Sequence, residues 1–222
     1  HFVSSGSENG VVYGSKQKLW VAAGDPSTAA APLLSILTSP DGITWSQISN
    51  GGFNNSGKGV GYGAGRYIAT GEDSAQHIKR SDDGKNWTHC PLPATAYAGG
   101  GYKAVAYGGD GKWVAVGSPT NTDYTILRST NNGETFKKIA IDNVRNGVIC
   151  ATFEFGEGFT VAYGNGIWVA GGDGGSDSKE NILWCDDDDM GFWNKTTADS
   201  SFFITNVKSI IYDGERFIAV GS

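Results

Sequence analysis

The side chains of this chain that are best suited to chemistry are carboxylates. Four aspartates are adjacent, at Asp186, Asp187, Asp188 and Asp189. Four neighbouring negative charges repel one another, and a bound Ca²⁺ would relieve that repulsion because this hard cation prefers oxygen ligands. Solvent screening would do the same without a metal, and the run lacks the spacing of a known calcium loop. We therefore expect no cofactor and no metal, and keep these four residues only as weak Ca²⁺ candidates.

Other aspartates recur in a fixed pattern instead of clustering. The stretch Ser-Pro-Asp-Gly-Ile-Thr-Trp at 39–45 returns at 81–87, returns at 129–136 with asparagine for the aspartate, and is degraded at 185–193. An Asp or Asn side chain can accept hydrogen bonds from backbone amides shortly after it, and glycine can take the positive φ of a tight turn. Each copy would therefore serve its own hairpin. We interpret the following residues as structural: Ser39, Asp41, Gly42, Trp45, Ser81, Asp83, Gly84, Trp87, Ser129, Asn131, Gly133 and Phe136.

Further lines of the sequence repeat around these turns. Apolar residues precede a tyrosine at Tyr13, Tyr62, Tyr107, Tyr163 and Tyr212. A few residues later a second line, apolar and ending in glycine, follows at 19–24, 66–71, 112–117, 167–172 and 216–221. A third strand leads into each Ser-Asp-Gly turn and a fourth leaves it at the aromatic residue. Four short strands in ~40–50 residues, with an aromatic signature in each unit, are typical of a β-propeller blade.

The sequence therefore predicts an all-β fold. We expect a β-propeller with five blades of four-stranded antiparallel sheets, in which the Ser-Asp-Gly turns join strands three and four. The whole chain, 1–222, is predicted to be one domain, with blade repeats at roughly 11–48, 59–90, 104–139, 160–196 and 209–222 and an N-terminal strand at 1–5. The 34 glycines and 12% aromatic residues agree with many short strands and turns.

The closure of the ring is open at this stage. The fifth repeat contains two predicted strands and no Ser-Asp-Gly turn. Residues 1–10 could supply one strand, at 1–4, that completes this blade by pairing the two termini. The alternative is that these residues are part of a longer propeller.

The repeated turns resemble a known family. They are similar to the Asp-box, or BNR, repeats of sialidases, xyloglucanases, sortilin-type receptors and a photosystem assembly factor, whose usual pattern is Ser-x-Asp-x-Gly-x-Thr-Trp. Residues 129–136 match it with Asn131 for the aspartate, and 39–45 and 81–87 match a form one residue shorter. That form, joined to a line such as 163–171, resembles uncharacterised propellers of bacterial and phage surface proteins. The resemblance implies the fold and no single activity, because Asp-box families do unrelated things on one scaffold.

A catalytic constellation is not evident in the sequence. A glycosidase needs two carboxylates flanking the scissile bond, about 5–9 Å apart, and Glu154 and Glu157 fall in one segment without a recognisable facing acid. A sialidase needs three converging arginines, because guanidinium binds carboxylate bidentately, and only Arg145 lies in a long loop. We predict that the protein is not an enzyme, with a glycoside hydrolase-like enzyme as the lesser alternative.

We expect the binding site on the face opposite the Ser-Asp-Gly turns. Strand order puts the connections between strands two and three, and those from strand four to the next blade, on that face, and they are long and divergent. Such loops are where sites are usually built, and aromatic rings beside polar groups suit sugars. The alternative is that most of these aromatics pin the loops onto the blades. The predicted ligand-binding residues are Phe53, His77, Tyr97, Tyr102, Tyr124, Arg145, Phe153, Glu154, Phe155, Asp173, Asp177 and Phe202.

Charge and composition limit the partners. The net charge is −6 and no lysine or arginine cluster occurs in the sequence, which argues against nucleic acid. No apolar run approaches the ~18 residues of a membrane helix, so we expect no membrane insertion. Three cysteines leave at least one unpaired, so no disulfide framework is predicted.

We therefore predict a non-enzymatic recognition or structural module. It would present variable loops for protein–protein contact at a surface or in a larger assembly. The alternative is a lectin-like carbohydrate-binding propeller, so the expected partner is a protein or a glycan. We expect an extracellular or surface-associated location.

Overall fold

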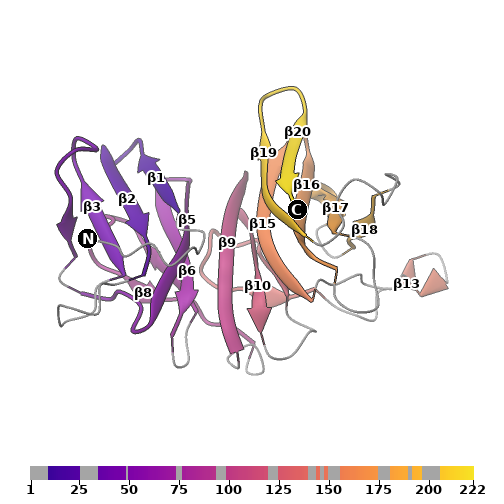
Figure 1. Ribbon diagram of the computed structural model, residues 1–222, viewed down its shortest axis with the longest axis horizontal. Helices are drawn as coiled ribbons and strands as arrows, with labels where there is room; N and C mark the ends of the chain where they lie inside the picture. Colours follow the sequence, from indigo (N-terminus) through magenta and orange to yellow (C-terminus); the bar gives the residue numbers. More distant parts are fainter. Residues whose placement is uncertain are drawn as a thin grey trace.

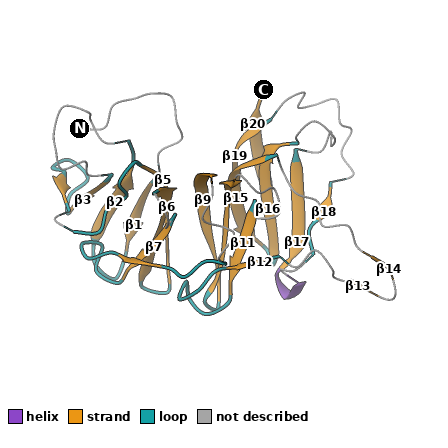
Figure 2. Ribbon diagram, turned by 90° about the horizontal axis from the view of Figure 1, so that it is seen from below, coloured by secondary structure: helices purple, strands orange, loops and turns teal. Residues whose placement is uncertain are grey.

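The computed structural model describes residues 10–25, 35–48, 50–73, 77–93, 99–119, 125–139, 144–145, 148–149, 156–174, 181–189, 192–196 and 206–222. Within these ranges the regular structure is β-strand, apart from one short 3₁₀ helix, η3 (Asp187–Asp189), drawn purple in Figure 2. The predicted all-β class is therefore confirmed. None of the described residues forms a helix long and apolar enough to cross a membrane.

Four sheets have four antiparallel strands each, in sequence order. Sheet 1 consists of β1 (Val11–Gly14), β2 (Leu19–Ala23), β3 (Ile36–Ser39) and β4 (Ser46–Gln47). Sheet 2 consists of β5 (Ser56–Gly63), β6 (Arg66–Glu72), β7 (Ile78–Ser81) and β8 (Thr88–His89). Sheet 3 consists of β9 (Gly99–Gly109), β10 (Lys112–Pro119), β11 (Ile126–Ser129) and β12 (Lys137–Lys138). Sheet 4 consists of β15 (Glu157–Gly164), β16 (Ile167–Asp173), β17 (Ile182–Asp186) and β18 (Asn194–Lys195).

Two smaller sheets complete the described structure. Sheet 5 pairs β19 (Val207–Tyr212) with β20 (Phe217–Gly221), and a short hairpin pairs β13 (Val144–Arg145) with β14 (Val148–Ile149). Sheet 5 thus has two strands among the described residues. The strand predicted at 1–5 to complete it lies outside them, so five closed blades stay a prediction.

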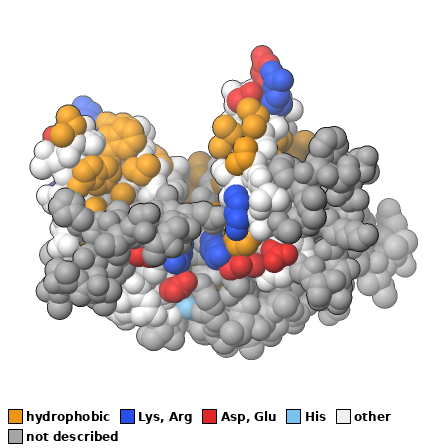
Figure 3. Space-filling view, in the orientation of Figure 1, with side chains coloured by type: hydrophobic (Ala, Val, Ile, Leu, Met, Phe, Trp, Pro, Cys, Tyr) orange, Lys and Arg blue, Asp and Glu red, His pale blue; other side chains and the backbone are white. Residues whose placement is uncertain are grey.

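The five numbered sheets stand side by side in chain order around a common axis (Figures 1 and 2). Their first strands contact one another in the order β1, β5, β9, β15 and β19. Sheets 1 and 5, at the two ends of this row, are separated by a hollow in the space-filling view (Figure 3). The described part of the molecule is therefore an arc of blades.

The Tyr-Gly pair at the end of a first strand has a packing reason. A Cβ on Gly63 would lie 2.0 Å from Cγ of Tyr107 in the next sheet, and a Cβ on Gly164 would lie 2.1 Å from Cγ of Tyr212. The ring of the following sheet therefore occupies the space above the glycine. This contact explains why the Tyr-Gly line repeats along the chain.

Buried apolar clusters fill the interfaces between neighbouring complete sheets. Between sheets 2 and 3, Ile68 and Ile78 pack in one cluster with Trp113, Leu127 and Phe136. The first two side chains come from sheet 2, and the other three from sheet 3. Sheets 3 and 4 each therefore seal the contact with the preceding sheet through the second strand, the third strand and the aromatic residue of the turn, and sheet 2 does so through its second strand and that aromatic residue.

The Ser-Asp-Gly turns have the hydrogen bonds that their sequence predicts. Asp83 Oδ1 accepts from the backbone amides of Lys85 and Asn86, both at 2.8 Å, and from Ser81 Oγ at 2.9 Å. Gly84 has φ of 76° and donates its amide to Ser81 Oγ at 2.8 Å. Corresponding bonds occur around Asp41 and, with an amide oxygen as acceptor, around Asn131. The turn is thus closed by its own residues.

These bonds predict a measurable acid sensitivity. Burial tends to raise the pKa of Asp83, but hydrogen bonds from the backbone and side chain of Asn86, from Lys85 and from Ser81 lower it from 3.8 to about 2. A carboxyl whose pKa is depressed in the folded state stabilises the protein above its unfolded pKa, and this contribution is lost as pH falls through the folded pKa. Part of the loss of thermal stability between pH 4 and pH 2 should therefore disappear in Asp83→Asn, which copies Asn131. Melting curves across this pH range would test this, and an unchanged pH slope in the variant would contradict it.

Candidate functional site

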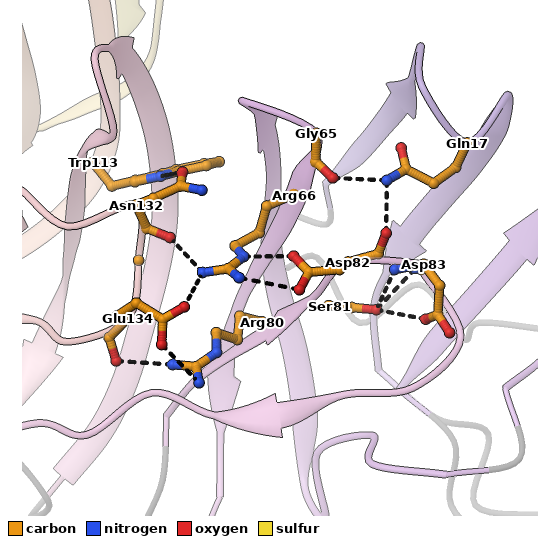
Figure 4. A network of polar contacts seen from close by, with 12 residues as sticks. Gln17, Gly65, Arg66, Arg80, Ser81, Asp82, Asp83, Trp113, Asn132 and Glu134 are labelled. Atoms are coloured by element: carbon orange, nitrogen blue, oxygen red, sulfur yellow. Dashed lines mark hydrogen bonds and ion pairs between the residues drawn. The ribbon is translucent and has the colours of Figure 1, made fainter.

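The face that carries the turns is held together by ion pairs between blades (Figure 4). Arg66 donates to the carboxylate of Asp82 from Nε at 2.6 Å and from Nη2 at 3.1 Å. Its Nη1 donates to Glu134 Oε1 at 2.6 Å and to the carbonyl of Asn132 at 2.8 Å, both in the turn of sheet 3. The hydrogen bond to Asp82 is the main cause that raises the pKa of Arg66 above its usual range. Arg80 also contacts Glu134, with Nη2 2.9 Å from Oε2. These arginines tie blades together.

Asp187, in the run of four aspartates, links the next two blades, sheets 3 and 4. Asp187 Oδ1 accepts from Trp168 Nε1 at 3.1 Å, and Asp187 Oδ2 lies 2.5 Å from Nζ of Lys112 in sheet 3. Its backbone amide donates to the carbonyl of Gly166 at 2.8 Å. In the part of the chain that the structure describes, no group of three or more His, Cys, Asp or Glu side chains is placed to hold a metal. The described carboxylate contacts of Asp187 are therefore structural.

On the opposite face, three predicted ligand contacts are interior residues. Phe53, His77 and Tyr102 are 0%, 2% and 0% exposed. The backbone amide of Phe53 donates to Ser35 Oγ at 2.7 Å, and the rings of His77 and Tyr102 lie 6.4 Å apart. Tyr102 lies within β9 and not in the expected loop, and Phe53 and Tyr102 belong to the buried apolar clusters between blades.

The remaining nine predicted residues are described to different extents. Asp173 is exposed at the end of β16. The side chain of Arg145 is outside the described part, although its backbone belongs to β13. The residues that lie wholly outside the described ranges are Tyr97, Tyr124, Phe153, Glu154, Phe155, Asp177 and Phe202. Their part in ligand binding stays a prediction.

A buried ion pair joins the end of β6 to β7. Lys79 Nζ is 3.0 Å from Asp73 Oδ2, and the two side chains are 4% and 6% exposed. Lys79 also donates to the carbonyl of Gly52 at 2.5 Å and lies over the ring of Phe53, 4.8 Å from its centroid. Asn54 Nδ2 donates to Asp73 Oδ1 at 2.8 Å. The pair thus joins β7 to the segment that precedes β5.

The structure also brings together residues that the sequence analysis missed. Lys58, Lys103, Phe159 and Lys208 each stand four residues before the tyrosine of their first strand. Because β5, β9, β15 and β19 are neighbours in this order, the four residues occupy one level of the arc. We call them the lysine row. The lysines are 45 and 105 residues apart in sequence, so only alignment of the repeats to their tyrosines could have found them.

Contacts within the lysine row are charged and aromatic. Nζ of Lys103 lies 4.5 Å from the centroid of the Phe159 ring, and Nζ of Lys208 lies 3.9 Å from it. Lys103 also pairs with Glu157 at 2.5 Å. Such placement of an ammonium group over an aromatic ring is a cation–π arrangement. Phe159 therefore contacts two of the three lysines of the row.

Carboxylates flank part of the row. Lys58 Nζ lies 3.4 Å from Asp25 and 3.6 Å from Glu72. Among the described residues, Lys208 is exposed and has no carboxylate within ion-pair distance. Figure 3 shows basic and acidic side chains gathered in the hollow, over β9 and β15. Among the described residues, the Lys208 end of the row therefore offers a partner a positive charge.

Antiparallel four-stranded sheets that stand side by side around an axis, each with its first strand against the next, define a β-propeller. Comparison with solved structures supports this class. YCF48 from Cyanidioschyzon merolae matches with a TM-score of 0.57 and 17% identity over 96% of this chain and 62% of that one. A structure of YCF48 bound to D1 peptide matches with a TM-score of 0.56 and 13% identity over 97% and 60%. This chain thus spans about three fifths of the YCF48 chains.

Two further propellers extend the comparison. A structure of a nidogen/laminin complex matches with a TM-score of 0.60 and 12% identity over 96% of this chain and 71% of that one. The GH74 xyloglucanase from Xanthomonas campestris matches with a TM-score of 0.50 and 14% identity over 96% and 35%. No family model and no curated protein matches the sequence. At these identities the likeness shows the fold alone.

Proposed function

We propose that this chain is a non-enzymatic recognition module that binds an acidic segment of a protein partner through the lysine row. The observation that carries the proposal is the placement of Lys103 and Lys208 over Phe159 at 4.5 and 3.9 Å. The contact with the ring restricts each lysine side chain, so less side-chain entropy is lost when a carboxylate-rich ligand binds. We also propose, from the sequence, that the protein is related to Asp-box propellers and acts at a surface or in a larger assembly.

The charge of the chain favours a short acidic segment as the ligand over a large polyanion. The chain as a whole carries −6, and carboxylates accompany Lys58 and Lys103. A nucleic acid would meet repulsion outside the row, whereas a short acidic segment would contact the row alone.

Glu157 and Glu72 are paired with lysines, which favours a binding role over hydrolysis. Among the similar propellers, one YCF48 structure is bound to a peptide and the nidogen structure is a complex with laminin, which supports a protein partner.

A peptide-array screen, run alongside a glycan array, would test the proposal. Peptides enriched in Asp and Glu should bind, and Lys103→Glu or Lys208→Glu should weaken the best of them by about tenfold or more, because a like charge then faces the ligand. Binding should also weaken as salt is added. The matched control is Lys85→Glu, an exposed lysine in the turn at 81–87 on the opposite face. Its binding should stay within about twofold, since it lies far from the row.

Two results would contradict the proposal. Equal losses for Lys85→Glu and Lys103→Glu would mean that overall charge, and not the row, governs binding. Selective capture of neutral glycans, with no acidic peptide bound, would instead favour the lectin-like alternative.

A further inference from the structure

Sheet 3 places two cations directly opposite each other. Arg128 of β11 and Lys137 of β12 are partners in the strand register, so their side chains project from the same face of the sheet. Like charges in such a pair repel and destabilise it. At this register position the other complete sheets pair Thr38 with Ser46, Arg80 with Thr88, and Trp184 with Asn194. Of the four complete sheets that the structure describes, sheet 3 alone therefore has two cations there.

The chain does not neutralise these two cations with its described carboxylates. Glu134, the acid of the same turn, pairs with Arg66 and Arg80 of sheet 2. Within the described ranges, no carboxylate lies within ion-pair distance of Arg128 or Lys137. Solvent alone would screen an open pair of cations, but this pair borders a pocket.

The pocket has a volume of about 230 Å³ and a polar lining. It is lined by Arg128, Ser129, Thr130, Asn131, Thr135 and Lys137. Its volume is below the ~300–1,000 Å³ of pockets for drug-sized ligands, so it suits a small ion or one charged group of a larger ligand. All lining residues belong to the segment 128–137, in which every residue is described. The pocket is therefore complete without a contribution from either end of the chain.

The turn at this pocket lacks the acid of the other copies. Asp41 and Asp83 hold this position in sheets 1 and 2, and Asn131 holds it in sheet 3. Asn131 Oδ1 still accepts from Ser129 Oγ at 2.9 Å and from the amide of Thr135 at 3.1 Å. Asn131 Nδ2 donates to Thr135 Oγ1 at 3.0 Å, which leaves its second N–H and the hydroxyl hydrogen of Thr135 for a further acceptor. The asparagine therefore keeps the turn and replaces a negative oxygen with a donor.

We propose that this pocket binds a phosphate group, either as inorganic phosphate or as a phosphate monoester. A phosphate monoester carries about −1.5 to −2 charge at pH 7 and three strong acceptor oxygens, which matches two cations and several neutral donors. The planar guanidinium of Arg128 would bind two of the oxygens. Lys137 would supply the second positive charge, and Asn131 and Thr135 would donate to the remaining oxygen. The pocket lies on the face of the turns, so its test does not depend on the lysine row or the proposed function.

Calorimetric titration of the unmodified 222-residue chain with sodium phosphate tests the site. Chloride keeps the ionic strength constant, so that screening does not change during the titration. We expect saturable binding with a dissociation constant of about 1 mM or lower. Acetate should bind about tenfold or more weakly, because it has a single charge and fewer acceptor oxygens than phosphate.

Variants in the turns locate the bound phosphate. Lys137→Gln should weaken phosphate binding by about tenfold or more, because one of the two charges is lost. The matched control is Lys85→Gln at an exposed lysine in the turn of sheet 2, which should change binding by less than about twofold. Asn131→Asp should abolish phosphate binding and retain the thermal stability, because Asp41 and Asp83 make the corresponding turn bonds.

Three outcomes would overturn the proposal. They are no saturation up to about 20 mM phosphate, equal losses in Lys137→Gln and Lys85→Gln, and unchanged phosphate binding in Asn131→Asp. Acetate that binds as tightly as phosphate would also overturn it, because the pocket would then select negative charge alone.

Two further titrations identify the source of the phosphate group. O-phosphoserine represents a phosphorylated side chain, and glucose 6-phosphate represents a phosphorylated sugar. Tighter binding of either than of inorganic phosphate supports the site and names the carrier. Equal or weaker binding of both would leave inorganic phosphate itself as the ligand, which also supports the site.

Discussion

Replacing Trp87 by alanine should lower the free energy of unfolding by about 3–5 kcal/mol, the usual cost of truncating a buried tryptophan. Trp87 is 7% exposed and packs at the interface between sheets 1 and 2 with Val21, Ile36 and Tyr67. The truncation would leave a cavity between two rigid sheets that cannot easily close around it. Denaturant melts with linear extrapolation would measure the change.

The matched control is Trp45→Ala. Trp45 has the same place in its turn, and its Nε1 donates to the carbonyl of Gly42 at 3.1 Å, just as Trp87 donates to Gly84 at 3.1 Å. However, Trp45 is partly exposed, because no described sheet packs against that side of sheet 1. Its loss should cost under about 1 kcal/mol. Equal losses in the two variants would show that the turn itself, and not packing between sheets, is the source of the stability.

The second large effect is expected at the buried ion pair. Lys79→Met keeps most of the side-chain volume but leaves the Asp73 carboxylate, which is 6% exposed, without its cation. Removing one partner of a buried pair typically costs about 3–5 kcal/mol. The same denaturant melts would report it. Lys85→Met, at an exposed site, should be close to neutral.

A double variant separates charge from packing. In Lys79→Met with Asp73→Asn, no buried charge remains, and Asn54 can still donate to the oxygen that replaces Oδ1, as it now does at 2.8 Å. We expect the double variant to recover a large part of the lost stability. If the double variant is less stable than Lys79→Met, the loss comes from packing around Lys79 and the ion-pair explanation is wrong.

The turns and the repeat could be predicted because their determinants are local. The contacts of Asp83 with Ser81, Lys85 and Asn86 lie within three residues of it. Local hydrogen bonds of this kind depend on the order of residues and little on the rest of the fold. Each repeat has four short strands and an aromatic residue, and only a few architectures can bury all of these aromatic residues. The sequence by itself therefore determined the all-β class, the strand order within a blade and the structural role of the turns.

The site depended on contacts between distant residues, which only the tertiary structure decided. Phe53 and Tyr102 have the residue types of ligand contacts and were expected in loops, but both are 0% exposed. Their burial depends on packing between neighbouring blades, and Tyr102 lies within β9. Lys103 and Lys208 meet at Phe159 only because β9, β15 and β19 stand in one row. Which residues are buried, and which lie close together across blades, depends on how the sheets stack. The spacing of residues in the sequence indicates this only when the repeats are aligned to one another.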